Sequence, residues 1–161
     1  MYHHRRYNEF VAETKFMEEA IKEASKALKT CDIPIGCVAV KDGKIIARAH
    51  NEKEKRQDAS AHAELLCLQK AAKKLGTWRL FDIDLFTTLE PCAMCAGAMV
   101  LARINAVHIG TWDPKAGAAG SVMDLLRSKH LNHKIKVSFA KGKVMDECSG
   151  LLKKFFLELR S

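Results

Sequence analysis

Apolar residues recur along this chain at two spacings, and the spacing separates predicted helices from predicted strands. From about Asn8 to Lys29, apolar positions fall three or four residues apart with Lys and Glu between them, which predicts an amphipathic helix. Ile35–Val40 and Ile45–His50 are short runs rich in β-forming residues, separated by a turn sequence that contains an Asp-Gly pair. The two runs are therefore predicted to pair as an antiparallel hairpin.

The rest of the chain alternates between helical and strand patterns. The charged stretch Glu52–Asp58 predicts a loop, and Ser60 is expected to cap a helix that runs to Leu75 and turns Leu65, Leu68, Ala72 and Leu75 inward. Further strands are predicted at Asp84–Leu89, Ala106–Thr111 and Ile135–Phe139, and further helices at Cys92–Arg103, Ser121–Leu126 and Asp146–Arg160. This order predicts an α/β fold, a three-layer α/β/α sandwich with a mixed five-stranded sheet, as one domain over residues 1–161.

Composition narrows the class of protein further. The 161 residues are enough for one ordinary core, and no apolar run is long enough to cross a bilayer, so no membrane partner is expected. Six scattered cysteines and a polar first segment favour a reducing, cytoplasmic location. The net charge of +8 is compatible with a polyanionic partner, and equally with an ordinary solvated surface.

Two short motifs carry the candidate chemistry. His62, Cys92 and Cys95 supply one nitrogen and two sulfur ligands, which suit zinc and leave its fourth position open for water or substrate. Glu64 lies two residues from a ligand, where it can exchange protons with the zinc-activated water without binding the metal. The Cys-x-x-Cys pair alone would equally suit a structural zinc site or a redox pair, but neither of these needs Glu64.

The combined pattern His-x-Glu and Pro-Cys-x-x-Cys is the signature of zinc nucleobase deaminases. Together with Ile33–Gly36, Thr88–Met99 and Gly117–Ser121, it resembles the bacterial tRNA-specific adenosine deaminases of the cytidine deaminase-like superfamily. The resemblance implies hydrolysis of wobble adenosine to inosine in the anticodon stem-loop of an arginine tRNA, with Glu64 as the proton shuttle. It also implies one Zn²⁺ per subunit and a cytoplasmic homodimer.

The same resemblance assigns the substrate contacts. Asn51 is similar to the residue that hydrogen-bonds the flipped nucleotide, Asp113 and Lys115 to anticodon-contacting loop positions, and Phe156 and Arg160 to stacking and phosphate contacts. Read from the residues alone, Asn51 also suits a simple turn, the loop charges suit plain solvation and Phe156 suits a core position. Trp112 departs from the family pattern, in which a smaller or charged residue is expected.

Two other functions remain open from the sequence. A deaminase of free guanine, cytosine or a nucleotide would share the zinc residues, and release of ammonia from free bases would distinguish it. An RNA-binding module with a structural zinc would release no ammonia from any substrate. Three protein ligands argue against the module, because structural zinc usually has four.

Overall fold

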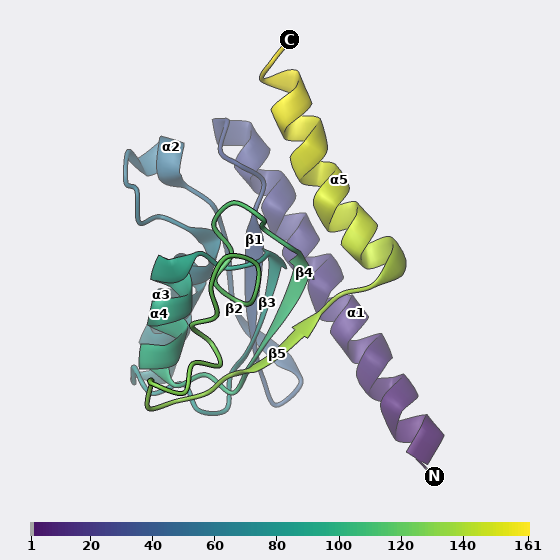
Figure 1. The fold of residues 1–161 in the computed structure, drawn as a ribbon, viewed down its shortest axis with the longest axis vertical. Helices are drawn as coiled ribbons and strands as arrows, with labels where there is room; N and C mark the ends of the chain where they lie inside the picture. The colour runs from purple at the N-terminus through teal and green to yellow at the C-terminus, as the bar shows by residue number, and fades with distance from the viewer. Residues whose placement is uncertain (1) are drawn as a thin grey trace.

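The fold of the protein, a computed structural model, is shown in Figure 1. The structure describes the backbone of residues 2–161 and the side chains of residues 13–161. Its helices are α1 Tyr2–Ala27, the 3-10 turn η1 Leu28–Thr30, α2 Lys53–Arg56, α3 Ala63–Leu75, α4 Ala93–Ala102 and α5 Gly142–Glu158, and its strands are β1 Gly36–Lys41, β2 Lys44–His50, β3 Asp84–Leu89, β4 Ala106–Thr111 and β5 Lys136–Phe139.

The strands form one mixed sheet in the order β2-β1-β3-β4-β5. Strand β1 is antiparallel to both β2 and β3, whereas β3–β4 and β4–β5 pair in parallel. The β1–β2 turn has Asp42 and Gly43 at positive φ (50° and 71°), the geometry that an Asp-Gly hairpin turn favours. The predicted mixed five-stranded sheet, antiparallel first and parallel later, is confirmed.

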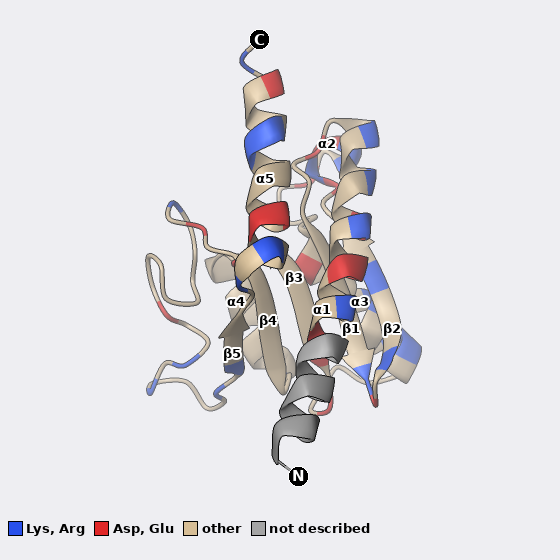
Figure 2. Ribbon diagram, turned by 90° about the vertical axis from the view of Figure 1, so that its right-hand side faces the viewer, with Lys and Arg blue, Asp and Glu red and all other residues tan. Residues whose placement is uncertain are grey.

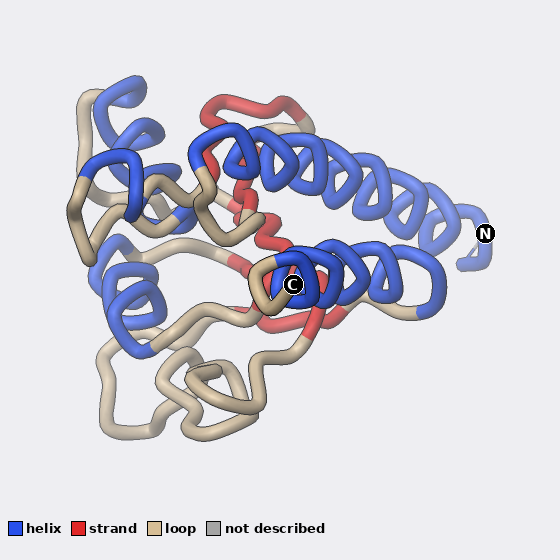
Figure 3. The backbone as a smooth tube through the Cα atoms, turned by 90° about the horizontal axis from the view of Figure 1, so that it is seen from above, coloured by secondary structure: helices blue, strands red, loops and turns tan. Residues whose placement is uncertain are grey.

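Helices cover both faces of the sheet. Helices α1 and α5 lie side by side on one face, and α3 and α4 lie on the other, as Figures 1 and 3 show. Among the described side chains of α1, the buried apolar ones are three alanines and one methionine: Met17, Ala20, Ala24 and Ala27. These residues let α1 approach β1 so closely that a Cβ atom on Gly36 would overlap the Ala20 carbonyl oxygen. The predicted three-layer sandwich is confirmed.

Several local predictions are wrong. The charged stretch after β2 contains the short helix α2, because the buried Asp32 carboxylate accepts N–H groups from Glu54 (2.7 Å) and Lys55 (3.2 Å). Ser60 does not cap α3; its hydroxyl bonds Asp58, and the helix begins after His62. Residues 121–126 form turns and an isolated bridge rather than a helix.

Two helices also differ in detail from their predictions. The fully buried residues of α3 are Ala63, Glu64, Leu66, Cys67, Leu68 and Ala71. Of the predicted stripe, Leu68 is buried, Leu65 and Ala72 pack partly buried against the core, and only Leu75 is exposed. Helix α5 begins four residues earlier than predicted, at Gly142. All six cysteines have free thiols, and no described helix is long and apolar enough to span a membrane.

Candidate active site

A cavity of about 790 Å³ lies at the carboxyl ends of the central strands. Leu89 and Thr111, the last residues of the parallel neighbours β3 and β4, contribute to its wall. Every site residue predicted from the sequence lines this cavity except Cys95, which is fully buried: Asn51, His62, Glu64, Cys92, Asp113, Lys115, Phe156 and Arg160. Residues from five separate chain segments therefore meet at the end of the sheet where ligands bind in open α/β folds.

The metal-ligand cluster, defined as His62, Cys92 and Cys95, is built at the beginnings of two helices. His62 is the residue immediately before α3, and Cys92 is the residue immediately before α4. Cys95 follows one turn later on α4, which brings both sulfur atoms to the same side of the helix. The partly positive N-terminus of α4 stabilises thiolates at these positions.

The spacing of the donor atoms fits a zinc ion. His62 Nδ1 lies 3.6 Å from the Sγ atom of Cys92 and 3.6 Å from that of Cys95, and all three donor atoms lie within 4.8 Å of one another. In a tetrahedral site, bonds of about 2.0 Å to nitrogen and about 2.3 Å to sulfur place these donors roughly 3.5 Å apart. The cluster could therefore hold a metal ion with three protein ligands.

The two thiols of the cluster differ in acidity. A hydrogen bond with the Cys95 thiol, and a second with His62, lower the pKa of Cys92 to about 3. The same Cys92–Cys95 contact, together with burial, raises the pKa of Cys95. The hydrogen bond with Cys92 also raises the pKa of His62. Cys92 is thus the first of the two thiols to become a thiolate, the form that binds metals.

Glu64 is a buried carboxyl group in the first turn of α3. Its side chain is 3% exposed, and the Cys95 Sγ atom lies 3.8 Å from its Oε2 atom. Burial raises the pKa of Glu64 to about 7, because a charged carboxylate is poorly stabilised away from water. A group that titrates near neutral pH beside a metal site can both accept and donate a proton.

Asn51 follows β2 and lies against the same cavity. It is 2% exposed, and its backbone N–H bonds the Ile35 carbonyl oxygen at 3.0 Å, which fixes the residue to the sheet. Its side-chain oxygen Oδ1 is buried and accepts no hydrogen bond from any residue that the structure describes. A buried acceptor without a partner is costly, so this oxygen suits a ligand that donates a hydrogen bond.

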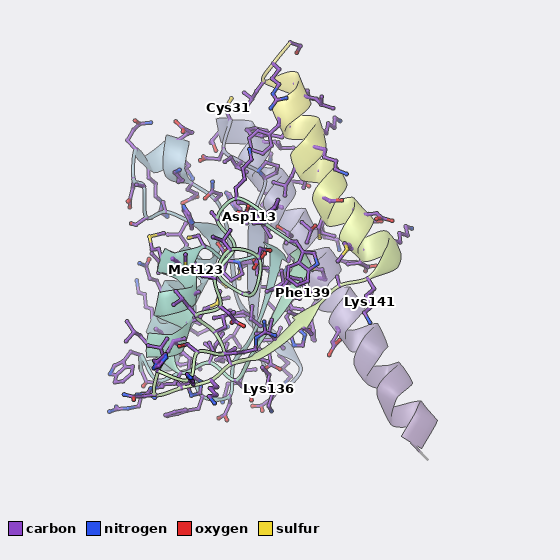
Figure 4. All side chains as sticks on the ribbon, viewed as in Figure 1. Cys31, Asp113, Met123, Lys136, Phe139 and Lys141 are labelled. Carbon is purple, nitrogen blue, oxygen red and sulfur yellow. The ribbon has the colours of Figure 1, made fainter. Side chains whose placement is uncertain are left out.

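The 112–121 loop, which follows β4, forms one wall of the cavity through Trp112–Ala116. Figure 4 shows Asp113 on this loop above Phe139 of β5. The Asp113 carboxylate accepts backbone N–H groups from Lys115 (3.0 Å) and Ala116 (3.3 Å), so it shapes the turn that presents Lys115. Trp112 stacks on Phe139 with ring centroids 3.5 Å apart and stays 46% exposed.

Helix α5 forms another part of the cavity wall. Two neighbouring phenylalanines of α5 differ in their environment. Phe155 is buried in the core, whereas Phe156 is 43% exposed and lines the cavity. Arg160, just beyond the helix, also lines the cavity. The alternative that Phe156 is a core residue is therefore excluded, because Phe155 occupies that position.

Sequence reasoning missed three charged residues of the cavity: Lys53, Lys153 and Glu90. Lys53 lies on the unpredicted helix α2, and Lys153 lies on the last helix, α5. Figure 2 shows Lys and Arg on both helices. Glu90 precedes Pro91 in the second motif, but its hydrogen bonds to the 112–121 loop, about 23 to 31 residues away, leave no local signal.

Comparisons with known proteins agree with this geometry. A sequence model of the MafB19-like deaminase family matches residues 11–160. The tRNA-specific adenosine deaminase of Bacillus subtilis is 51% identical over 145 residues, which cover 90% of this chain and 89% of that protein. The Aquifex aeolicus tRNA-specific adenosine deaminase is 40% identical, with 91% and 95% covered.

A solved structure of a tRNA deaminase also has the same fold as this chain. A chain from a study of A-to-I editing by tRNA:A34 deaminases at the wobble position superposes with a TM-score of 0.81 and 40% identity, covering 86% of this chain and 99% of that one. The fold match agrees with the cytidine deaminase-like fold expected from the resemblance. This chain belongs to the MafB19-like deaminase family and, within it, to the tRNA-specific adenosine deaminases.

Proposed function

We propose that this protein hydrolyses the wobble adenosine of a tRNA anticodon stem-loop to inosine, and that an arginine tRNA is its substrate. The observation that carries the proposal is the unpartnered Oδ1 atom of Asn51, which lies in the same cavity as Glu64 and the metal-ligand cluster. This arrangement puts an acceptor for a nucleoside hydroxyl or amino group in the same cavity as a proton carrier. The names of the Bacillus subtilis and Aquifex aeolicus relatives, both tRNA-specific adenosine deaminases, support an adenosine in tRNA as the substrate.

In this proposal, His62 Nδ1 and the Cys92 and Cys95 thiolates hold one Zn²⁺ per subunit. When bound, zinc supplies a Lewis acid that lowers the pKa of a water molecule toward neutrality. Glu64 takes a proton from the attacking water and delivers it to the ring nitrogen next to the attacked carbon. It then carries a second proton to the leaving amine, so that one water is consumed and one ammonia is released.

The cavity supports an extruded nucleotide rather than a stacked base pair. Glu64 is 3% exposed, so a base inside a helical stack cannot reach it, and the target nucleotide must flip into the cavity. Phe156 and Trp112 are half-exposed aromatic side chains that can receive unstacked neighbouring bases. Lys115 and Arg160 are proposed to contact backbone phosphates, with Asp113 shaping the turn that carries Lys115.

We further propose a cytoplasmic homodimer of a single deaminase domain per chain. Apolar side chains exposed on α4 and after the 112–121 loop support an association surface: Met94 (39%), Leu101 (74%), Val122 (52%) and Met123 (43%). Sedimentation equilibrium of the purified protein tests this part. A Leu101→Asp variant should shift the distribution toward monomer, and a monomeric wild type would contradict the proposal.

Ammonia release tests the reaction and the substrate together. Zinc-loaded protein is incubated with an anticodon stem-loop carrying adenosine at the wobble position, with the same stem-loop carrying guanosine there, and with free adenine, guanine and cytosine. We expect ammonia only from the adenosine stem-loop. Turnover of a free base without turnover of the RNA would instead indicate a free-base deaminase, and RNA binding without any ammonia would indicate a binding module.

A further inference from the structure

Glu90 is a buried carboxylate between β3 and α4 whose hydrogen bonds all go to the 112–121 loop. Glu90 is only 1% exposed to solvent. Oε1 accepts the backbone N–H groups of Ala119 and Ser121, each at 3.0 Å. Oε2 accepts the backbone N–H of Asp113 at 2.9 Å and the hydroxyl of Ser121. One side chain therefore holds both ends of the loop.

The loop is also joined to the backbone that carries the metal ligands. Ala118 donates its N–H to the Pro91 carbonyl oxygen at 2.8 Å, and Gly117 forms an isolated β-bridge with Cys92. A Cβ atom on Gly117 would overlap the Glu90 carboxyl group, so only glycine allows this close approach. The position of the loop relative to Cys92 is thus set at Glu90 and its two following residues.

Glu90 holds the loop without taking part in the metal-ligand cluster. Among the residues that the structure describes, no Lys, Arg or His lies within ion-pairing distance of its carboxylate, and the groups that donate hydrogen bonds to it all belong to the 112–121 loop. Burying a carboxylate is costly unless hydrogen bonds compensate, and here four donors do so. The carboxylate is therefore kept in place by the loop, and the loop by the carboxylate.

We propose that Glu90 is a positioning residue for RNA binding: it fixes the 112–121 loop as a preformed wall that presents Trp112 and Lys115 to the anticodon loop. The inference rests on the proposed function. A preformed wall avoids the entropy cost of ordering ten loop residues when RNA binds. Loss of Glu90 should therefore weaken RNA binding more than it slows the chemical step.

The test is the substitution Glu90→Gln, assayed with the adenosine stem-loop. An amide keeps the size of the side chain but offers one acceptor oxygen, and its NH₂ group faces loop N–H donors. We expect KM and the RNA dissociation constant to rise about tenfold or more, with kcat reduced less than about threefold and the zinc content unchanged. Glu23→Gln is the matched control, because Glu23 is also a buried carboxylate (4% exposed) but does not line the cavity.

A second variant keeps the test decisive if Glu90→Gln does not fold. Ser121→Ala removes one hydroxyl donor to Glu90, so KM should rise in the same direction by a smaller factor. In the double variant the two effects should be less than additive, because both remove the same contact. The inference would be overturned if KM were unchanged in both Ser121→Ala and Glu90→Gln. It would also be overturned if both variants lost activity through a lower kcat alone.

Limited trypsin cleavage after Lys115 reports the loop independently of activity, since Lys115 is exposed. Glu90→Gln should be cleaved faster than wild type and Glu23→Gln at the wild-type rate. Equal rates in all three proteins would overturn the role of Glu90 whether or not the enzyme is active. A wild type that forms no inosine but shows the expected cleavage pattern would overturn the proposed function, and with it the claim of RNA binding, while retaining the fixed loop.

Discussion

The metal-ligand cluster and the 112–121 loop share one cavity, but different kinds of structure hold them. His62 and Cys92 each precede a regular helix, so backbone hydrogen bonds of α3 and α4 fix their positions. The loop has no helix of its own and depends on the buried carboxylate of Glu90. The comparison indicates that the metal-binding residues are held by two regular helices, whereas the loop that carries Trp112 and Lys115 is held by one buried carboxylate from a distant part of the chain.

The largest expected effect is removal of a metal ligand. His62→Ala deletes one of three donors, so we expect the purified protein to lose its zinc and all measurable inosine formation. Zinc content by mass spectrometry and inosine yield are measured on the same sample. A His62→Ala protein that retains stoichiometric zinc and activity would show that His62 is not a ligand.

The next effect separates proton transfer from metal binding. Glu64→Gln keeps the shape of the side chain but removes the group whose pKa burial raises to about 7. We expect kcat to fall by about 10²–10⁴-fold, the usual contribution of a general acid or base, while zinc content and RNA affinity are retained. Wild-type kcat in a zinc-loaded Glu64→Gln protein would remove Glu64 from the mechanism.

A smaller effect is expected on the loop side of the comparison. Gly117→Ala forces a Cβ atom against the Glu90 carboxyl group, so the loop must shift and KM should rise about tenfold, equivalent to roughly 1.4 kcal/mol. Gly150→Ala on α5 is the control, because a Cβ there meets no atom within 4 Å. It should leave KM unchanged and stabilise the fold by about 0.5–1 kcal/mol. Equal KM values for both variants would mean that the loop tolerates displacement.

The smallest expected effect concerns a single charge at the cavity mouth. Lys115→Ala should weaken binding of the stem-loop several-fold and reduce the slope of log affinity against log salt by about 0.7. Lys22→Ala serves as the comparison, because Lys22 is paired with Glu19 on α1 and does not line the cavity. An unchanged salt slope in Lys115→Ala would indicate that Lys115 does not contact a phosphate.

Local sequence patterns predicted most of the fold and the metal-ligand cluster, because these features depend on residues that are close together in the sequence. The hairpin turn at Asp42-Gly43, the strand β3 and the helix α4 all follow from neighbours within a few residues. Helix α2 and the turns at 121–126 were mispredicted because distant carboxylates decide them. Asp32 binds the N-terminus of α2, and Glu90 binds Ser121 in place of a helix cap.

The residues proposed to contact the substrate, in contrast, have no local sequence signal. They were identified through resemblance to a family, since nothing local marks Asn51 as a buried acceptor or Phe156 as an exposed ring. Lys53 and Glu90 were missed because their relation to the cavity appears only after the chain has folded. The sequence patterns therefore did not predict the roles of residues that depend on contacts between distant parts of the chain.

The central claim is that one cavity combines a proton-carrying metal site with a preformed RNA-contacting loop. Position-resolved mass spectrometry of an anticodon stem-loop, treated with zinc-loaded wild-type protein, tests it most directly. We expect one inosine, at the wobble position alone, with one ammonia released per inosine and every other adenosine unchanged. Inosine spread over several adenosines, or none at all from zinc-loaded protein, would contradict the account.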